Sequence, residues 1–196
     1  MQTMTSALRH LCERLRLLKR DEHGASAVEF AMILPLLVTA YLGCVEVTQG
    51  LSIDRKLSQA TWSVADLVAQ KRDANASGKI ELSAAEMTEI MNAAKAVIYP
   101  YPTKDLKIVV SSVKIDPQNV TKVDWSCQLN GTARSKGQTV TLPPAMQVAG
   151  TSVIWAEGSY AYKPTVGYMV TGTVNLKDQT FARSRVGSDI EVASCG

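Results

Sequence analysis

The side chains most often used for catalysis and metal binding are sparse in this chain of 196 residues. Its only two histidines, His10 and His23, both precede the long apolar stretch that begins near residue 25. The remaining sequence therefore lacks the imidazole that Ser-His-Asp sites, Cys-His sites and histidine-ligated zinc require. We expect no catalytic residue, no metal ligand and no cofactor in the main body of the protein.

One short motif could support acyl transfer, because Ser111-Ser112-Val113-Lys114 fits the S-x-x-K pattern. That chemistry needs a serine at the start of a helix and the companion motifs S-D-N and K-T-G, and neither companion occurs. The stretch also has the composition of a strand. No nucleophile elbow, phosphate-binding loop or dinucleotide fingerprint is present either. A hydrolase is therefore the weakest alternative, and the protein is predicted not to be an enzyme.

Composition excludes two further classes of protein. The net charge of +3 is too mild to support binding to nucleic acid, and the 46% of hydrophobic residues is too high for a disordered chain. The length allows one compact domain with an appendage. The elements that position any functional residue must therefore be sought in that domain and in the appendage.

The appendage is the apolar stretch at residues 25–47. As a helix its 23 residues would extend roughly 34 Å, which exceeds a bilayer core of about 30 Å. It carries no charge between Glu29 and Glu46 and is apolar on every face, which is unusual for a buried helix. Basic residues are concentrated before it, and only Arg55 and Lys56 follow closely. The positive-inside rule then predicts a cytoplasmic N-terminus.

The start of this stretch has an unusual order of residues: a basic leader, Gly24, four small or apolar residues, Glu29 and Phe30. This order resembles the processing site of type IV prepilins, which implies cleavage between Gly24 and Ala25. A carboxylate inside a bilayer is unfavourable by roughly 2.5–3.5 kcal/mol unless it has a cationic partner. The new α-amine of Ala25, one helical turn away, or that of a neighbouring subunit would supply one. Glu29, with Phe30 beside it, would then set the register between subunits.

The finer resemblance is to the TadE-like family, minor pseudopilins of the tight-adherence (Tad) type IV pilus. It is carried by GASAVEFAMILPLL from Gly24, by GCVEV from Gly43 and by LSIDRKLSQATWSVADLVA from Leu51. The resemblance covers about residues 20–70, a quarter of the chain, and the chain length fits the TadE or the TadF type.

The resemblance implies an assembly subunit that acts in pilus initiation or biogenesis by protein–protein binding. The implied partners are a prepilin peptidase, the major pilin, a companion minor pseudopilin and the inner-membrane assembly platform. The implied location is a single pass through the bacterial inner membrane with a periplasmic C-terminal domain, or the pilus itself. The alternative is an uncleaved single-pass anchor that presents a periplasmic binding domain.

Pro35 lies inside the apolar stretch, where a proline removes one helical hydrogen bond and leaves the carbonyl of Ala31 without its usual donor. A kink is therefore expected at Pro35. Two interpretations stay open: a tolerated bend, or a flexible point that lets the subunit leave the bilayer and enter a filament.

The sequence divides into four segments: a basic cytoplasmic leader at 1–24, a transmembrane helix at 25–47, an amphipathic helical extension at 48–70, and an extracytoplasmic α+β domain at 71–196. Apolar residues recur in the extension at steps of three and four, which indicates one buried face. These residues are Ile53, Leu57, Ala60, Val64, Leu67 and Val68.

A second helix is predicted to begin at Ser83, because Ser83 and Glu86 form a capping box flanked by Leu82 and Met87 as a hydrophobic staple. From Leu106 onward the period changes toward two. Strands are predicted in LKIVVSSVKI, in KVDWSCQL and at 151–162, 167–174 and 181–186, with a possible hairpin turn at Asn130-Gly131. The fold class is therefore α+β, with an antiparallel sheet packed on helices.

The four cysteines divide by compartment. Cys12 lies in the leader and Cys44 in the apolar stretch, whereas Cys127 and Cys195 belong to the extracytoplasmic domain, where oxidation is permitted. A disulfide between Cys127 and Cys195 would tie the C-terminus to a central strand. The alternative is two free thiols.

Overall fold

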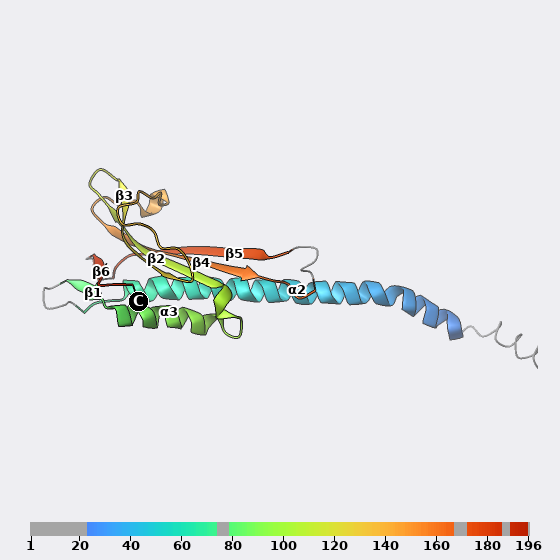
Figure 1. Cartoon of the computed structure of the whole chain (residues 1–196). Helices are drawn as coiled ribbons and strands as arrows, with labels where there is room; N and C mark the ends of the chain where they lie inside the picture. Colours follow the sequence, from blue (N-terminus) through green and yellow to red (C-terminus); the bar gives the residue numbers. More distant parts are fainter. Residues whose placement is uncertain (1–22, 74–78, 167–171, 186–188, 196) are drawn as a thin grey trace, which may run out of the picture. The chain divides into compact units, whose positions relative to one another are not determined.

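The computed structural model describes residues 23–73, 79–166, 172–185 and 189–195. It contains one long helix, a shorter helix and an antiparallel sheet, so the predicted α+β class is confirmed (Figure 1). The chain forms two compact units, one up to Val45 and one from Glu46 to Gly196. We call the second unit the head. Most of the predicted leader, residues 1–22, lies outside the described residues.

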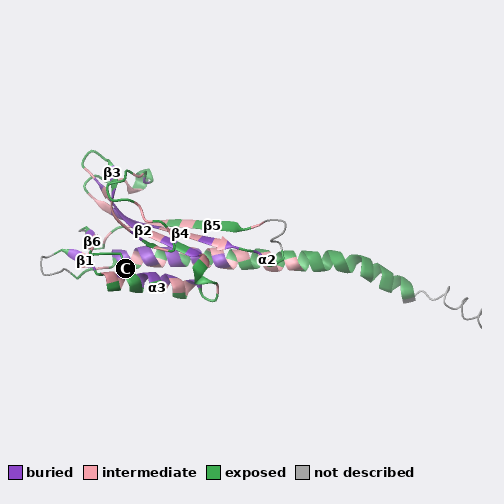
Figure 2. Cartoon of the chain, viewed as in Figure 1, coloured by how far each residue is buried: buried purple, intermediate pink, exposed green. Residues whose placement is uncertain are grey.

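The long helix α2 (His23–Ala69) runs without interruption through Pro35. Every side chain from residue 24 to residue 41 is exposed, which Figure 2 shows as a continuous green stretch of the helix. Its composition and length are those of a helix that could cross a membrane, and it is the single such candidate in the described part of the chain. A core helix of a soluble protein would instead be largely buried.

Within the head, α2 presents an apolar stripe to the other elements, as the three- and four-residue steps predict. The buried members on this stripe are Ile53, Leu57, Ala60, Val64 and Val68. Leu67 was expected to be buried with them but is 39% exposed. It lies at the edge of the stripe close to the end of the helix, where fewer neighbours cover it.

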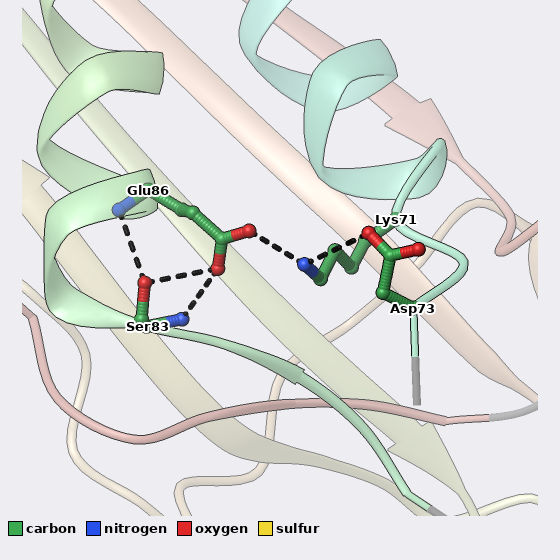
Figure 3. A network of polar contacts seen from close by, with 4 residues as sticks. All are labelled: Lys71, Asp73, Ser83 and Glu86. Carbon is green, nitrogen blue, oxygen red and sulfur yellow. Dashed lines mark hydrogen bonds and ion pairs between the residues drawn. The ribbon is translucent and has the colours of Figure 1, made fainter. Parts of the chain in front are cut away.

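The second helix, α3 (Ala84–Ile98), begins at the predicted capping box, and its apolar stripe is buried against α2 and the sheet. The Ser83 side chain accepts a hydrogen bond from the Glu86 amide, and the Glu86 carboxylate accepts one from the Ser83 amide. Lys71, just after α2, donates to the same carboxylate at 2.5 Å and also contacts Asp73 (Figure 3). This network joins the end of one helix to the start of the other.

Four strands form the main sheet in the order β3-β2-β4-β5, and all neighbours are antiparallel. The strands are β2 (Leu106–Ile115), β3 (Thr121–Leu129), β4 (Ser152–Tyr162) and β5 (Val174–Ala182). A separate parallel pair, β1 (Ile80–Leu82) with β6 (Ile190–Val192), was not predicted from the sequence. Three residues per strand are too few for a clear alternation.

The hairpin of this sheet lies between β2 and β3, so the turn predicted at Asn130-Gly131 is wrong as a hairpin. The Asp116 carboxylate accepts hydrogen bonds from the amides of Gln118 and Val120, and Asn119 takes a positive φ of 61°. Asx turns of this kind tolerate a left-handed residue. Asn130 instead follows β3, and its side-chain amide donates to the Leu106 carbonyl at 3.0 Å.

The strand predicted at 151–162 is confirmed as β4, but the two predicted after it are replaced by the single strand β5. Residues 167–171 and 186 of those predictions lie outside the described residues. β5 is an edge strand with a largely polar sequence, so its buried face is not marked by a run of apolar residues.

The inner face of the sheet packs against α2 at very close range. Gly158 of β4 makes this possible, because a Cβ atom there would lie 2.1 Å from the Thr61 hydroxyl oxygen and 2.9 Å from a methyl carbon of Leu57. Ile108, Val110 and Ala156 complete the adjacent core. A second, smaller apolar cluster lies on the other side of the sheet around Val113, Val153 and Trp155.

Candidate processing site and the base of the head

The predicted cleavage position lies in α2, where Gly24 and Ala25 directly follow His23, the first described residue of the helix. Gly24 is exposed, and a Cβ atom built on it would meet no other atom within 4 Å. Among the residues that the structure describes, none covers the Gly24–Ala25 bond or occupies the space that a larger residue at position 24 would need.

Glu29 is exposed on α2 four residues after Ala25, a spacing that places the two residues on the same helical face. Phe30 beside it is 59% exposed, and the apolar side chains that follow it toward the middle of the segment are exposed as well. The arrangement is a carboxylate on a largely apolar surface, with the exposed Ser26 three residues before it. Such a carboxylate can pair with an ammonium group.

Pro35 does not end the helix. One turn later, the Thr39 hydroxyl donates a hydrogen bond to the Pro35 carbonyl at 2.8 Å, a contact that serine and threonine often make within helices. The kink at Pro35 stays a prediction, and the choice between a tolerated bend and a flexible point stays open.

Glu46, at the far end of the apolar stretch, is held by the loop that follows β4. Its carboxylate accepts hydrogen bonds from the Tyr162 hydroxyl at 3.1 Å, the Thr165 amide at 3.1 Å and the Val166 amide at 2.7 Å. Burial, together with the hydrogen bond to Glu46, raises the pKa of Tyr162 to about 12. Three donors on one carboxylate fasten this loop to the first turn of α2 within the head.

Gly50 completes this contact, one turn after Glu46. A Cβ atom at Gly50 would lie 3.4 Å from the ring of Tyr162, so the aromatic ring packs directly over the glycine. In the sequence Glu46 is only the carboxylate that ends the charge-free run, and its partner Tyr162 is 116 residues away along the chain. No local pattern could have paired them.

The family model described as TadE-like protein matches residues 24–65. This segment of the chain is similar to TadE-like proteins. The match confirms the resemblance drawn from Gly24, Glu29 and the apolar helix, and it extends through Glu46 and Gly50. No curated protein and no solved structure matches the chain. TadE-like proteins are structural and assembly proteins of the Tad pilus and are not known as enzymes, and the similarity of this chain to them covers residues 24–65.

The TadE-like segment therefore contains the predicted processing residues, whereas the S-x-x-K motif lies outside it on β2. There the Ser111 hydroxyl is 2.8 Å from the Ser126 hydroxyl. The Lys114 ammonium is paired with Asp124 at 2.9 Å and Asp189 at 3.2 Å. Serine and lysine are thus engaged with other groups. Within the described residues, no cluster of three or more His, Cys, Asp or Glu side chains could hold a metal ion.

The two cysteines beyond the TadE-like segment form a disulfide, Cys127–Cys195. Cys127 is fully buried on β3, which is an edge strand and not the central strand expected from the sequence. The bond joins the main sheet to the segment after β6, and the indole nitrogen of Trp125 reinforces this connection by donating to the Ile190 carbonyl at 2.7 Å. The C-terminal end of the chain is thereby fixed to the sheet.

Proposed function

We propose that the protein is a minor pseudopilin of a Tad-type pilus that acts in pilus initiation or assembly by binding other subunits. The observation that carries the proposal is the TadE-like match, which begins at Gly24, the residue predicted to end the leader. The leader at 1–24 is cytoplasmic, the helix at 25–47 anchors the chain in the inner membrane, and the segments at 48–70 and 71–196 lie in the periplasm.

In this proposal a prepilin peptidase cuts between Gly24 and Ala25. The exposure of Gly24 and Ala25 within the described part of the chain supports such access. The partners after cleavage are the major pilin, a companion minor pseudopilin and the inner-membrane assembly platform. The fully exposed apolar surface of residues 24–41 supports contacts with lipid before assembly and with other subunit helices afterwards.

Glu29 sets the register of those helix–helix contacts. A carboxylate on an apolar surface strongly favours the one arrangement that places a cation against it. The α-amine of Ala25 supplies this cation, either within the subunit or from its neighbour. Phe30 flanks the pair and shields it from water.

The experiment is mass measurement of the protein extracted from membranes of bacteria that co-express a prepilin peptidase. The wild-type chain should begin at Ala25. Gly24→Leu should keep the leader, because the peptidase can no longer accommodate the residue before the bond. Gly43→Leu is the matched control, since a Cβ atom at Gly43 also meets nothing within 4 Å, and it should be processed like the wild type.

The competing function is an uncleaved anchor that presents a periplasmic binding domain. It predicts an intact leader in the wild-type protein even when the peptidase is active. Normal trimming of Gly24→Leu would also contradict the proposed processing. A strain that expresses a catalytically inactive peptidase provides the reference mass of the uncleaved chain.

A further inference from the structure

The outer face of the main sheet, opposite α2, divides into a covered part and an open part. The covered part is the small apolar cluster around Val113, Val153 and Trp155, over which Leu142 packs. The open part is a groove of about 840 Å³ whose floor is formed by β2, β4 and β5. The charged and polar side chains Lys107, Glu157, Ser159 and Lys177 line this floor, together with the apolar Val109.

One wall of the groove is the segment from Gly131 to Arg134, and it is fixed in place. The Arg134 amide donates to the Ser126 hydroxyl at 3.0 Å, and the Ala133 amide donates to the Gln128 side-chain carbonyl. A Cβ atom at Gly131 would lie 3.0 Å from a methyl carbon of Val109, so a glycine allows the wall to lie directly on the sheet. The groove is thus preformed, which lowers the entropy lost on binding.

The one arginine of the groove is already engaged. Both terminal nitrogens of the Arg134 guanidinium contact the Glu157 carboxylate, one of them at 2.9 Å, and the guanidinium lies 3.9 Å from the centre of the Trp155 ring. This pair neutralises the acidic side chain of the floor. Asp178 also borders the groove. Successive side chains of a strand point to opposite faces of the sheet, so Asp178 lies on the inner face with Leu176, which packs against the core, and Lys177 lies on the outer face.

Two lysines are left to determine the charge of the open floor. Lys107 pairs in register with Ser159, and Ser159 pairs in register with Lys177, so the two ammonium groups flank one hydroxyl in a row across three strands. Both lysines are exposed, and neither takes part in an ion pair within the described residues. Two strand spacings of about 4.8 Å separate their backbones by about 10 Å.

We propose that this groove binds an acidic, extended segment of a partner protein, with carboxylates held by Lys107 and Lys177 and a backbone or side-chain oxygen held by Ser159. The floor offers donors and cations, which select an acceptor-rich, negatively charged ligand. An extended chain advances about 3.3 Å per residue, so carboxylates two to four residues apart match the two lysines. The inference rests on the proposed assembly function and specifies the chemistry of one partner.

The test is fluorescence anisotropy with the full chain in uncharged detergent micelles and a rhodamine-labelled peptide of alternating glutamate and threonine. The wild type should bind this peptide and not its glutamine–threonine analogue. Lys107→Gln combined with Lys177→Gln should weaken binding by about tenfold. Lys95→Gln combined with Lys122→Gln makes the same change in net charge away from the groove and should alter affinity by less than about twofold.

Equal weakening by both double variants would overturn the proposal, because binding would then follow net charge alone. Absence of binding by the wild type would overturn it as well. Tighter binding of the carboxylated polysaccharide alginate, lost in the Lys107 and Lys177 variant, would assign the groove to a glycan and not to a protein. The unprocessed Gly24→Leu chain should bind the peptide like the wild type, so a failure of processing and a failure of the groove are separate results.

Discussion

The apolar segment of α2 (residues 24–45) and its packed segment (residues 46–69) have similar lengths and lie on one continuous helix. In the apolar segment, side chains from 24 to 41 are exposed on all sides of the helix. In the packed segment, small and apolar residues face the sheet and α3, while Asp54, Arg55 and Asp66 are not buried. The periodicity of the sequence, and not its helical propensity, separates the two.

The contrast shows where each segment finds its stabilisation. The packed segment buries its stripe within the chain and contributes directly to the stability of the head. The apolar segment finds no such partner among the described residues, so its large apolar surface is suited to a membrane or to other helices. Substitutions of the same chemical type in the two segments should therefore differ sharply in their effect on the head.

Removing the disulfide should give the largest loss. Cys127→Ala combined with Cys195→Ala frees a link between residues 68 positions apart, which a loop-closure estimate values at about 4 kcal/mol. Cys44→Ala, in the apolar segment, should leave the unfolding of the head unchanged. Urea unfolding followed by tryptophan fluorescence measures this, because all three tryptophans lie in the head at Trp62, Trp125 and Trp155. Equal unfolding midpoints for the two variants would contradict the prediction.

Leucine truncation compares the two segments most directly. Leu57 is fully buried between α2 and the sheet, so Leu57→Ala should destabilise the head by about 3 kcal/mol. Leu37, 53% exposed in the apolar segment, has no packing of this kind, and Leu37→Ala should shift the unfolding free energy by less than about 0.5 kcal/mol. The same urea titration tests both, and a loss from Leu37→Ala comparable to that from Leu57→Ala would remove the distinction between the segments.

The sequence predicts most differences between the two segments of α2, because the patterns that distinguish them involve residues close together in the chain. The apolar run, the stripe on α2 from Ile53 and the Ser83–Glu86 capping box each depend on residues within a few turns of one another. The same holds for the processing pattern at Gly24 and Glu29. These features follow from helix geometry alone, and all of them except the capping box lie in or next to residues 24–65, which the TadE-like family model matches.

The contacts that the sequence could not predict are those that join distant segments. Glu46 binds Tyr162, and the groove places Lys107 beside Lys177, each through strand register that no local pattern encodes. The error at Asn130-Gly131 has a similar cause, because the Asn130 side chain binds the carbonyl of Leu106 at the start of another strand. The sequence did not predict the extent of β5, because an edge strand can pair through its backbone with few buried side chains and so lacks an alternating apolar pattern.

A glycine pair tests how closely the packed segment approaches the sheet. Gly158→Ala would place a methyl group against Thr61 and Leu57 and should destabilise the head by about 2 kcal/mol. Thr61→Ala in the same chain should recover part of this loss by removing the nearest atom. Gly43→Ala, where the space is open, should not affect the head. Thermal unfolding of Gly158→Ala, Thr61→Ala, the double variant and Gly43→Ala provides the measurement, and additive losses in the double variant would show that Gly158 and Thr61 do not meet.

The smallest expected effect is a pH dependence that belongs to one carboxylate of the head. Hydrogen bonds from Lys71 and from Ser83 lower the pKa of Glu86 to about 2, below its ordinary value of about 4.5. A carboxyl group with a lowered folded-state pKa stabilises the fold above its unfolded pKa, and the contribution disappears as the pH falls through the folded value. Because the Glu86 side chain is 40% exposed, solvent screening reduces the contribution to about 1 kcal/mol.

The difference in unfolding free energy between the wild type and Glu86→Gln should therefore fall by more than half between pH 6 and pH 3, as protons begin to compete with Lys71 for the carboxylate. Glu29→Gln is the counterpart in the apolar segment, where the carboxylate has no role in folding the head. Its difference from the wild type should be near zero at both pH values. A pH-independent effect of Glu86→Gln would mean that the capping hydrogen bonds, which glutamine partly retains, matter more than the charge opposite Lys71.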